Sequence, residues 1–174
     1  HTPAINMVKK QASALKIPLI QVATEGEKEV ELKDLEKALK EAKKEHKIEG
    51  VVTGAVASTY QATRIQNICD NLDLTCFNPL WQKDQVELLN ELLEKKFEII
   101  ITKIAADGLN RSFLGKKFTP GLIDKLKKLK IHPAGEGGEL ETFVTNCPLF
   151  KAPLAIKSQE KIMDSQHSGY LKCS

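Results

Sequence analysis

Segments with helical spacing of apolar residues alternate along the chain with short, β-rich apolar segments, and this alternation restricts the fold more than any other feature. Helices are expected at residues 2–15, 32–46, 58–72 and 84–95, and strands at residues 18–24, 50–53 and 97–104. Ser58, with Gln61 three residues later, has the spacing of a capping box. Repetition of helix and strand in this order predicts an α/β fold with a Rossmann-like, doubly wound parallel sheet.

The rhythm changes after Ile104. Residues 105–118 are rich in glycine and polar side chains, and Thr119-Pro120 opens another helix that runs to Leu129. Residues 134–139 hold three glycines in four positions and must form a turn or loop. Weak strands are expected at residues 154–157 and near Tyr170. We therefore expect one domain at residues 1–104 and a smaller α+β domain at residues 105–174.

Charge and cysteine content argue against several classes of protein. The chain has 26 basic and 23 acidic side chains, and a net charge of +3 does not indicate a nucleic-acid or membrane surface. No apolar run approaches the roughly 18 residues that span a bilayer, and the first residues lack a signal-peptide pattern, so a cytoplasmic location is expected. The four cysteines have no Cys-x-x-Cys spacing, which predicts reduced thiols rather than a zinc site or disulfides, with Cys69 in the core.

The first candidate site follows the strand at residues 50–53. Small residues from Gly54 lead to the capped helix at Ser58, so an open backbone meets a helix N-terminus where α/β sheets bind ligands. Tyr60, Gln61 and Arg64 lie in the first two turns of that helix, and the planar guanidinium of Arg64 suits a phosphate or a carboxylate. A plain strand-to-helix turn with a cap and a surface arginine explains the same residues.

The second candidate site is the segment Gly135-Glu-Gly-Gly-Glu-Leu-Glu-Thr142. It gathers the carboxylates of Glu136, Glu139 and Glu141 around a glycine-rich backbone, which suits a cation, either Mg²⁺ or a cationic organic substrate. An acidic surface hairpin is the alternative. His132 is a candidate base, although a single histidine before a loop is more often polar surface.

The order and spacing of these blocks resemble the diphthine–ammonia ligase family of PP-loop ATP pyrophosphatases. The resemblance covers about Thr2 to Phe150, and its most specific part is the glycine–glutamate segment. The blocks that carry it are residues 54–64, Cys69, Pro79-Leu-Trp81, Gly108-Leu109, Leu114-Gly115 and residues 135–142.

The resemblance implies a fold and a reaction. Residues 1–104 would form a nucleotide-binding domain of the adenine nucleotide α-hydrolase (PP-loop) type, and residues 105–174 a substrate-recognition domain. The enzyme would use ATP, Mg²⁺ and ammonium to amidate diphthine, a modified histidine on translation elongation factor two. An acyl-adenylate would form on the way, with AMP and pyrophosphate as products. Assembly into a homo-oligomer is left open.

The resemblance also implies roles for particular residues. The nucleotide side would comprise Gly54, Ala55, Ser58, Tyr60, Gln61 and Arg64, and the substrate side Glu136, Gly137, Gly138, Glu139, Glu141 and Thr142. Diphthine carries a quaternary ammonium, which suits an acidic loop. Asn146 stands where the family often has aspartate. No residue is assigned as catalytic or as a metal ligand.

The family's Ser-Gly-Gly-Lys-Asp-Ser phosphate loop has no counterpart among the 174 residues. The resemblance implies that residue 1 falls in the second helix of the family's fold, so we expect that the first strand, first helix and second strand are missing from this sequence. We expect the chain alone to be inactive as a ligase, because the amides and lysine that cradle phosphates are not in it. Two alternatives stay open: another PP-loop ATP pyrophosphatase acting on tRNA, and a nucleotide-binding module without catalysis.

Overall fold

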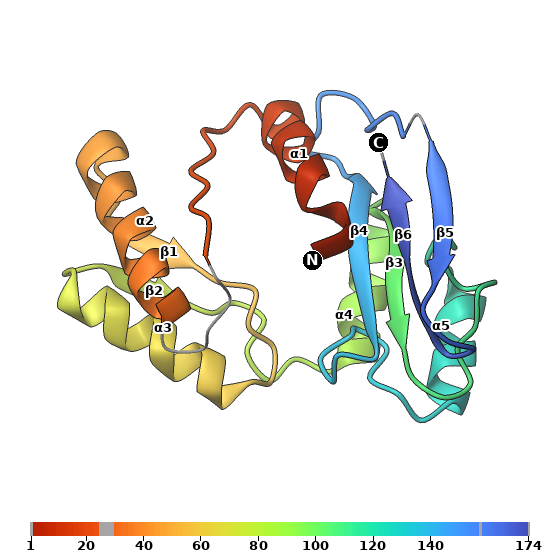
Figure 1. Ribbon diagram of the computed structural model, residues 1–174. Helices are drawn as coiled ribbons and strands as arrows, with labels where there is room; N and C mark the ends of the chain where they lie inside the picture. The colour runs from red at the N-terminus through yellow and green to blue at the C-terminus, as the bar shows by residue number, and fades with distance from the viewer. Residues whose placement is uncertain (1, 25–29, 157, 174) are drawn as a thin grey trace. The chain divides into compact units, whose positions relative to one another are not determined.

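The computed structural model describes residues 2–24, 30–156 and 158–173. The chain forms two compact units, which Figure 1 shows coloured along the sequence. The large unit comprises His1–Pro18 and Asp84–Ser174, and the small unit comprises Leu19–Lys83. None of the helices in the described ranges is both long and apolar enough to cross a bilayer.

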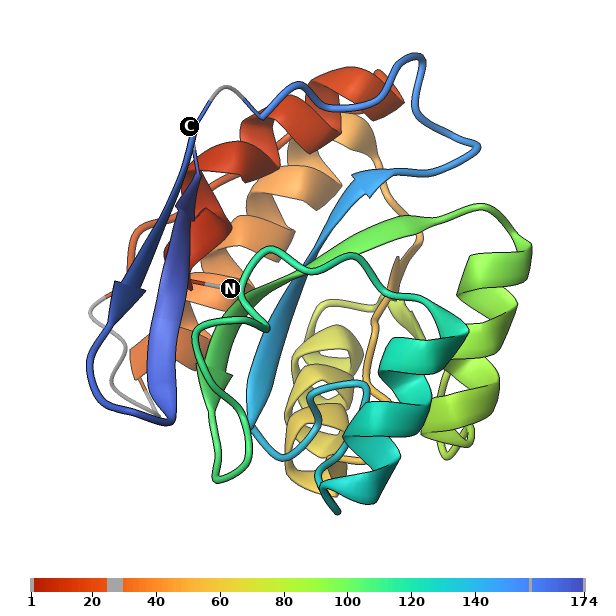
Figure 2. The same ribbon diagram turned by 90° about the vertical axis from the view of Figure 1, so that its right-hand side faces the viewer.

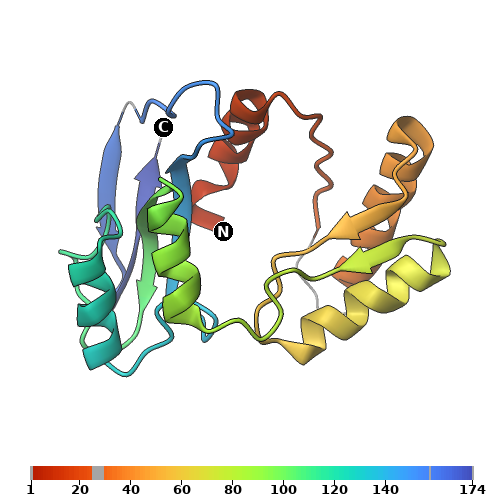
Figure 3. The same cartoon turned by 180° about the vertical axis from the view of Figure 1, so that it is seen from behind.

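The small unit is built on two short parallel strands. β1 (Gly50–Val52) pairs with β2 (Thr75–Phe77), and Val52 lies opposite Phe77. Two helices, α2 (Val30–His46) and α3 (Thr59–Asn71), lie beside these strands (Figure 3). Lys43 Nζ donates to the backbone carbonyl of Leu72 at 2.5 Å, which joins the C-terminal part of α2 to the end of α3.

Local sequence explains where α3 begins and what it buries. Ser58 is the N-cap, and its hydroxyl accepts a hydrogen bond from the Gln61 amide at 3.3 Å, as the capping-box spacing predicts. Cys69 is fully buried on this helix, as expected. Burial, together with the neighbouring Cys76, raises the pKa of the Cys69 thiol to about 11, so this cysteine stays protonated at neutral pH.

The large unit contains a four-stranded antiparallel sheet in the order β4-β3-β6-β5. The strands are β3 (Glu98–Ala105), β4 (Leu140–Asn146), β5 (Gln159–Met163) and β6 (Ser168–Cys173). In β3, Ile99, Ile100, Ile101 and Ile104 are all almost completely buried. This strand is therefore the centre of the sheet and of the hydrophobic core.

Helices cover both faces of this sheet. On one face lie the 3₁₀ helix η1 (Thr2–Met7) and α1 (Val8–Leu15), and on the other lie α4 (Gln85–Glu94) and α5 (Pro120–Lys128) (Figure 2). The side chains of Asp84 and Thr119 cap the N-termini of α4 and α5. The core draws on every layer of the unit, with Met7, Phe113, Leu126, Leu140 and Leu171 among its most buried side chains.

Comparison with the sequence analysis confirms the mixed α/β class, in which a small parallel sheet and an antiparallel sheet coexist. All five expected helices form, within a few residues of their expected bounds, and the first of them is divided into η1 and α1. Two strand predictions were wrong. Residues 18–24 form no strand, and neither do residues 154–156, while Lys157 lies outside the described residues.

The strand predicted at residues 97–104 forms, but its neighbours are antiparallel, so it does not continue the parallel sheet. The small unit ends at Lys83 and the chain returns to the large unit at Asp84, so β3 lies wholly in the large unit. The division at residue 104 therefore stays a prediction about where nucleotide and protein substrate are recognised.

Candidate functional site

The turn after β1 is held by polar residues that follow the two parallel strands. The Thr53 amide donates to the Phe77 carbonyl at 3.0 Å, the Thr53 hydroxyl hydrogen-bonds to Asn78 Oδ1, and the Ala55 amide donates to Thr53 Oγ1 at 3.2 Å. A Cβ atom on Gly54 would meet nothing within 4 Å. The backbone at Gly54 is therefore open to a ligand at the carboxyl end of the small sheet.

A cavity of about 310 Å³ lies between α2 and α3. It is lined by Glu31, Leu32, Leu35, Tyr60, Gln61, Arg64 and Ile65. The guanidinium carbon of Arg64 lies 3.5 Å from the centre of the Tyr60 ring, a stacked cation–π arrangement. This cavity offers an aromatic ring, an amide and a cation beside an apolar wall.

The structure thus brings three of the six expected nucleotide-binding residues onto one cavity. These are Tyr60, Gln61 and Arg64. Gly54, Ala55 and Ser58 lie in the turn that precedes α3 and do not line it. Ser58 is occupied as the helix cap.

The glycine–glutamate segment is an ordered loop of the large unit that leads into β4. The Ala105 amide donates to the Glu139 carbonyl at 2.7 Å, and this bond ties the loop to the end of β3. Two successive turns close inside the loop, because the Gly135 amide donates to His132 O at 2.9 Å and the Gly138 amide to Gly135 O at 3.0 Å. Gly135 and Gly138 have φ values of +85° and +80°, which favour glycine.

The three glutamates of this segment have different surroundings. Glu139 Oε1 lies 2.8 Å from His132 Nδ1, Glu141 Oε1 lies 3.1 Å from Lys103 Nζ, and Glu136 is exposed. Thr142 lies on β4 opposite Ile101. No group of three or more metal-binding side chains comes together within the described ranges, so these carboxylates do not build a magnesium cage of their own.

Glu139 is ionised because of its hydrogen bonds. Burial acts to raise its pKa, but the hydrogen bonds from the His132 ring and from backbone amides outweigh this effect, and the pKa lies below its ordinary value. The loop therefore keeps a negative charge next to the imidazole of His132 at neutral pH.

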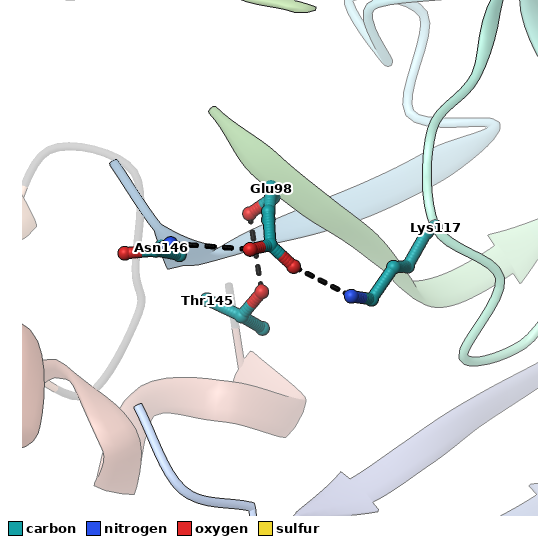
Figure 4. Close-up of polar contacts among 4 residues, drawn as sticks. All are labelled: Glu98, Lys117, Thr145 and Asn146. Atoms are coloured by element: carbon teal, nitrogen blue, oxygen red, sulfur yellow. Dashed lines mark hydrogen bonds and ion pairs between the residues drawn. The ribbon is translucent and has the colours of Figure 1, made fainter. Parts of the chain in front are cut away.

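A second polar cluster connects β3, β4 and the loop before α5 (Figure 4). Glu98 accepts hydrogen bonds from Lys117 Nζ at 2.5 Å and from Asn146 Nδ2 at 3.1 Å, while the Thr145 hydroxyl donates to the Glu98 carbonyl at 3.2 Å. Lys117 first and Asn146 second hold the pKa of Glu98 below its ordinary value. Asn146 is thus a hydrogen-bond donor to a carboxylate.

Sequence reasoning did not single out Thr53, Asn78 or Lys103. A signal existed for the first two, since each directly follows a strand and the carboxyl ends of parallel strands meet at one edge. Lys103 gave no local signal, because its partner Glu141 is distant in the sequence. His132 was considered, and only the fold shows that it contacts Glu139.

Comparison with known proteins gives matches along nearly the whole chain. Residues 1–76 match the diphthamide synthase N-terminal domain, and residues 84–174 match the diphthamide synthase C-terminal domain. The first of these is the PP-loop type of domain that the resemblance implied.

Several curated relatives are named diphthine–ammonia ligase. The chain is 44% identical over 123 residues to the one from Schizosaccharomyces pombe, a match that covers 68% of this chain and 20% of the relative. It is 38% identical over 152 residues to the one from Mus musculus, covering 83% and 57%. For the one from Homo sapiens the identity is 37% over 139 residues, covering 78% and 52%. The chain thus spans about half the length of the mammalian relatives and a fifth of the fission-yeast relative, and it belongs to the diphthamide synthase family.

Proposed function

We propose that the complete protein containing this chain is an ATP-dependent ligase that amidates diphthine on translation elongation factor two with ammonium. The observation that carries this proposal is the match of both family domains, in order, to the two parts of the chain. The names of the relatives support the same activity. We place the reaction in the cytoplasm, where the elongation factor works.

The cavity between α2 and α3 supports a role in nucleotide binding. Tyr60 offers a ring face to a purine, and Arg64 offers a cation to phosphate oxygens. Gly54 leaves the neighbouring backbone open to close approach. Ala55, Ser58 and Gln61 complete the proposed nucleotide side.

The glycine–glutamate loop is the proposed contact for the diphthine side chain. Its carboxylates favour a quaternary ammonium electrostatically, and Glu136 is exposed to meet one. Gly137, Gly138, Glu139, Glu141 and Thr142 belong to the same loop and strand. Mg²⁺ would be held mainly by the phosphates of ATP.

The chemistry explains the need for ATP. A carboxylate is a poor electrophile until one of its oxygens becomes part of a leaving group. Adenylation achieves this and releases pyrophosphate. Ammonia then attacks the acyl carbon and AMP leaves.

The test uses protein expressed from the complete reading frame, incubated with elongation factor that carries diphthine, ATP and ¹⁵N-ammonium. Mass spectrometry of the modified peptide should show the labelled amide, with one AMP formed for each amide. Glutamine in place of Glu136 should weaken use of the protein substrate, while Glu87→Gln, an exposed change on α4, serves as the control. Absence of labelled amide and of AMP in the wild type would remove the proposal.

A further inference from the structure

The loop before β4 holds a histidine–carboxylate pair that the proposed reaction has not yet used. Glu139 Oε1 lies 2.8 Å from His132 Nδ1 and 3.3 Å from the His132 backbone nitrogen. The same carboxylate oxygen therefore contacts both the ring and the backbone amide of His132. The His132 side chain is 57% exposed and that of Glu139 20% exposed. The carboxylate therefore lies under the ring, and the ring remains open to the surface.

The backbone makes room for this pair at Gly137. A Cβ atom there would lie within 2.5 Å of both His132 Nδ1 and Glu139 Oε1, and closer still to Glu139 Oε2. Any side chain at this position would displace the carboxylate, the imidazole or both. Gly137 does not have a positive φ, so the side-chain pair, and not the backbone conformation, favours glycine at this position.

The contact selects a tautomer. With an ionised carboxylate on Nδ1, the ring carries its proton on that nitrogen and donates it to Glu139. Nε2 then has a free lone pair and can accept a proton from a molecule outside. This is the arrangement in which a histidine acts as a general base.

We propose that His132 is the base that deprotonates the ammonium nucleophile in the amidation, with Glu139 as its positioning residue. The inference rests on the proposed function. Ammonium gives a proton to Nε2 and becomes ammonia, whose lone pair forms the C–N bond with the acyl carbon. The C–O bond to the adenylate breaks with its electron pair, AMP leaves, and the new amide loses its extra proton to water.

The strength of His132 as a base depends on the charged groups around it. Glu139 is the charged group in contact with the ring. Glu136 lies on the same loop, and Lys130 precedes it at the end of the α5 region. Lys103 and Glu141, on the adjoining strands, form an ion pair with each other at 3.1 Å. The Lys103 ammonium is thereby directed to Glu141.

The experiment compares two nucleophiles in protein from the complete reading frame. Ammonium must lose a proton before it attacks, whereas hydroxylamine is already unprotonated at neutral pH and traps acyl-adenylates as hydroxamates. His132→Gln should lower ammonium-dependent amide formation about 100-fold or more. Hydroxamate formation and ATP–pyrophosphate exchange should change little, because adenylation does not need this base.

Two further measurements separate a base from a structural residue. The deficit of His132→Gln should shrink as the pH is raised, because free ammonia then becomes abundant, and Glu139→Gln should show a smaller deficit of the same kind. His167→Gln is the matched control, since the His167 ring faces a neutral acceptor, Leu109 O, at 2.9 Å. It should keep wild-type use of both nucleophiles.

If His132→Gln lowers amide formation from ammonium and hydroxamate formation from hydroxylamine equally, or does not lower amide formation, His132 is not the base. If that variant does not fold, the wild type decides alone: an acidic limb in the pH profile that is the same for both nucleophiles contradicts the proposal. A wild type without pyrophosphate exchange and without either product refutes the proposed function instead.

Discussion

At the scale of single residues, the sequence identifies an unusual segment but not the task of each residue in it. The glycines and glutamates at residues 135–141 are visible in the sequence. That Glu139 meets His132 and Glu141 meets Lys103 is not, because a contact between a loop and a distant strand leaves no local pattern. The cap at Ser58 is the opposite case, since both of its partners lie within one helical turn.

Alanine at Gly137 should be damaging although the loop is exposed. The added methyl group overlaps the ends of the His132 and Glu139 side chains, which must turn away and lose their contact, so we expect the free energy of unfolding to fall by about 0.5–1.5 kcal/mol in urea denaturation. Gly121→Ala, in the first turn of α5 with nothing within 4 Å, should raise it by about 0.4–1 kcal/mol. Equal effects at the two positions would contradict the close packing at Gly137.

Arg64→Ala should weaken nucleotide binding more than it disturbs folding. The stacked contact with Tyr60 is worth about 0.5–1 kcal/mol at a partly exposed site, which limits the loss of stability. Calorimetric titration of ATP into protein from the complete reading frame measures the first effect, and urea unfolding the second. A variant that loses several kcal/mol of stability but binds ATP normally would show that Arg64 is structural.

At the scale of elements, helices were predicted well because caps and apolar spacing are local signals. β3 was located correctly, but its apolar run was taken as typical of a parallel strand. A central antiparallel strand with helices on both faces is buried in the same way and has the same composition. Pro18–Thr24 is apolar enough for a strand, yet strand formation depends on a neighbour that the segment itself does not specify.

Asn146→Asp should weaken the junction of β3 and β4 in a pH-dependent way. The pKa of Glu98 is lowered in the folded state, so its charge stabilises the fold at neutral pH, and this contribution is lost as the pH falls through the folded pKa. A second carboxylate facing Glu98 repels its charge and so removes part of this stabilisation. The free energy of unfolding should fall by less than about 1 kcal/mol at neutral pH, since the site is partly exposed.

Urea unfolding at neutral and acidic pH measures this cost. It should vanish at acidic pH, where the carboxyl groups are protonated. Asn146→Ala, which removes the donor without adding charge, should cost less than aspartate at neutral pH, and its deficit should also shrink at acidic pH because Glu98 is then protonated. A cost for aspartate that does not depend on pH would contradict the electrostatic explanation.

At the scale of the whole molecule, the main hydrophobic core lies within the large unit. The small unit has a two-stranded sheet in which Val52 and Phe77 are 70% and 59% exposed. Two-stranded sheets are marginally stable without further packing. This organisation could not be inferred from composition, because apolar residues are spread evenly over both units.

Hydrogen exchange should reveal this difference. The amides of Ile99, Ile100 and Ile101 in β3 should exchange more slowly than those of Val51 and Val52 in β1, because β3 opens only with the main core. Mass spectrometry of peptides from the two strands provides the measurement. Equal protection would show that the two units unfold as one cooperative block.

The space at Gly137 also bears on genetics. Every amino acid reachable from a glycine codon by one nucleotide change has a Cβ atom, so each missense substitution at this codon places an atom against the imidazole and carboxylate. Gly121 has open space around the same position. Inherited variation in this gene should therefore be depleted of missense alleles at codon 137 but tolerate alanine alleles at codon 121.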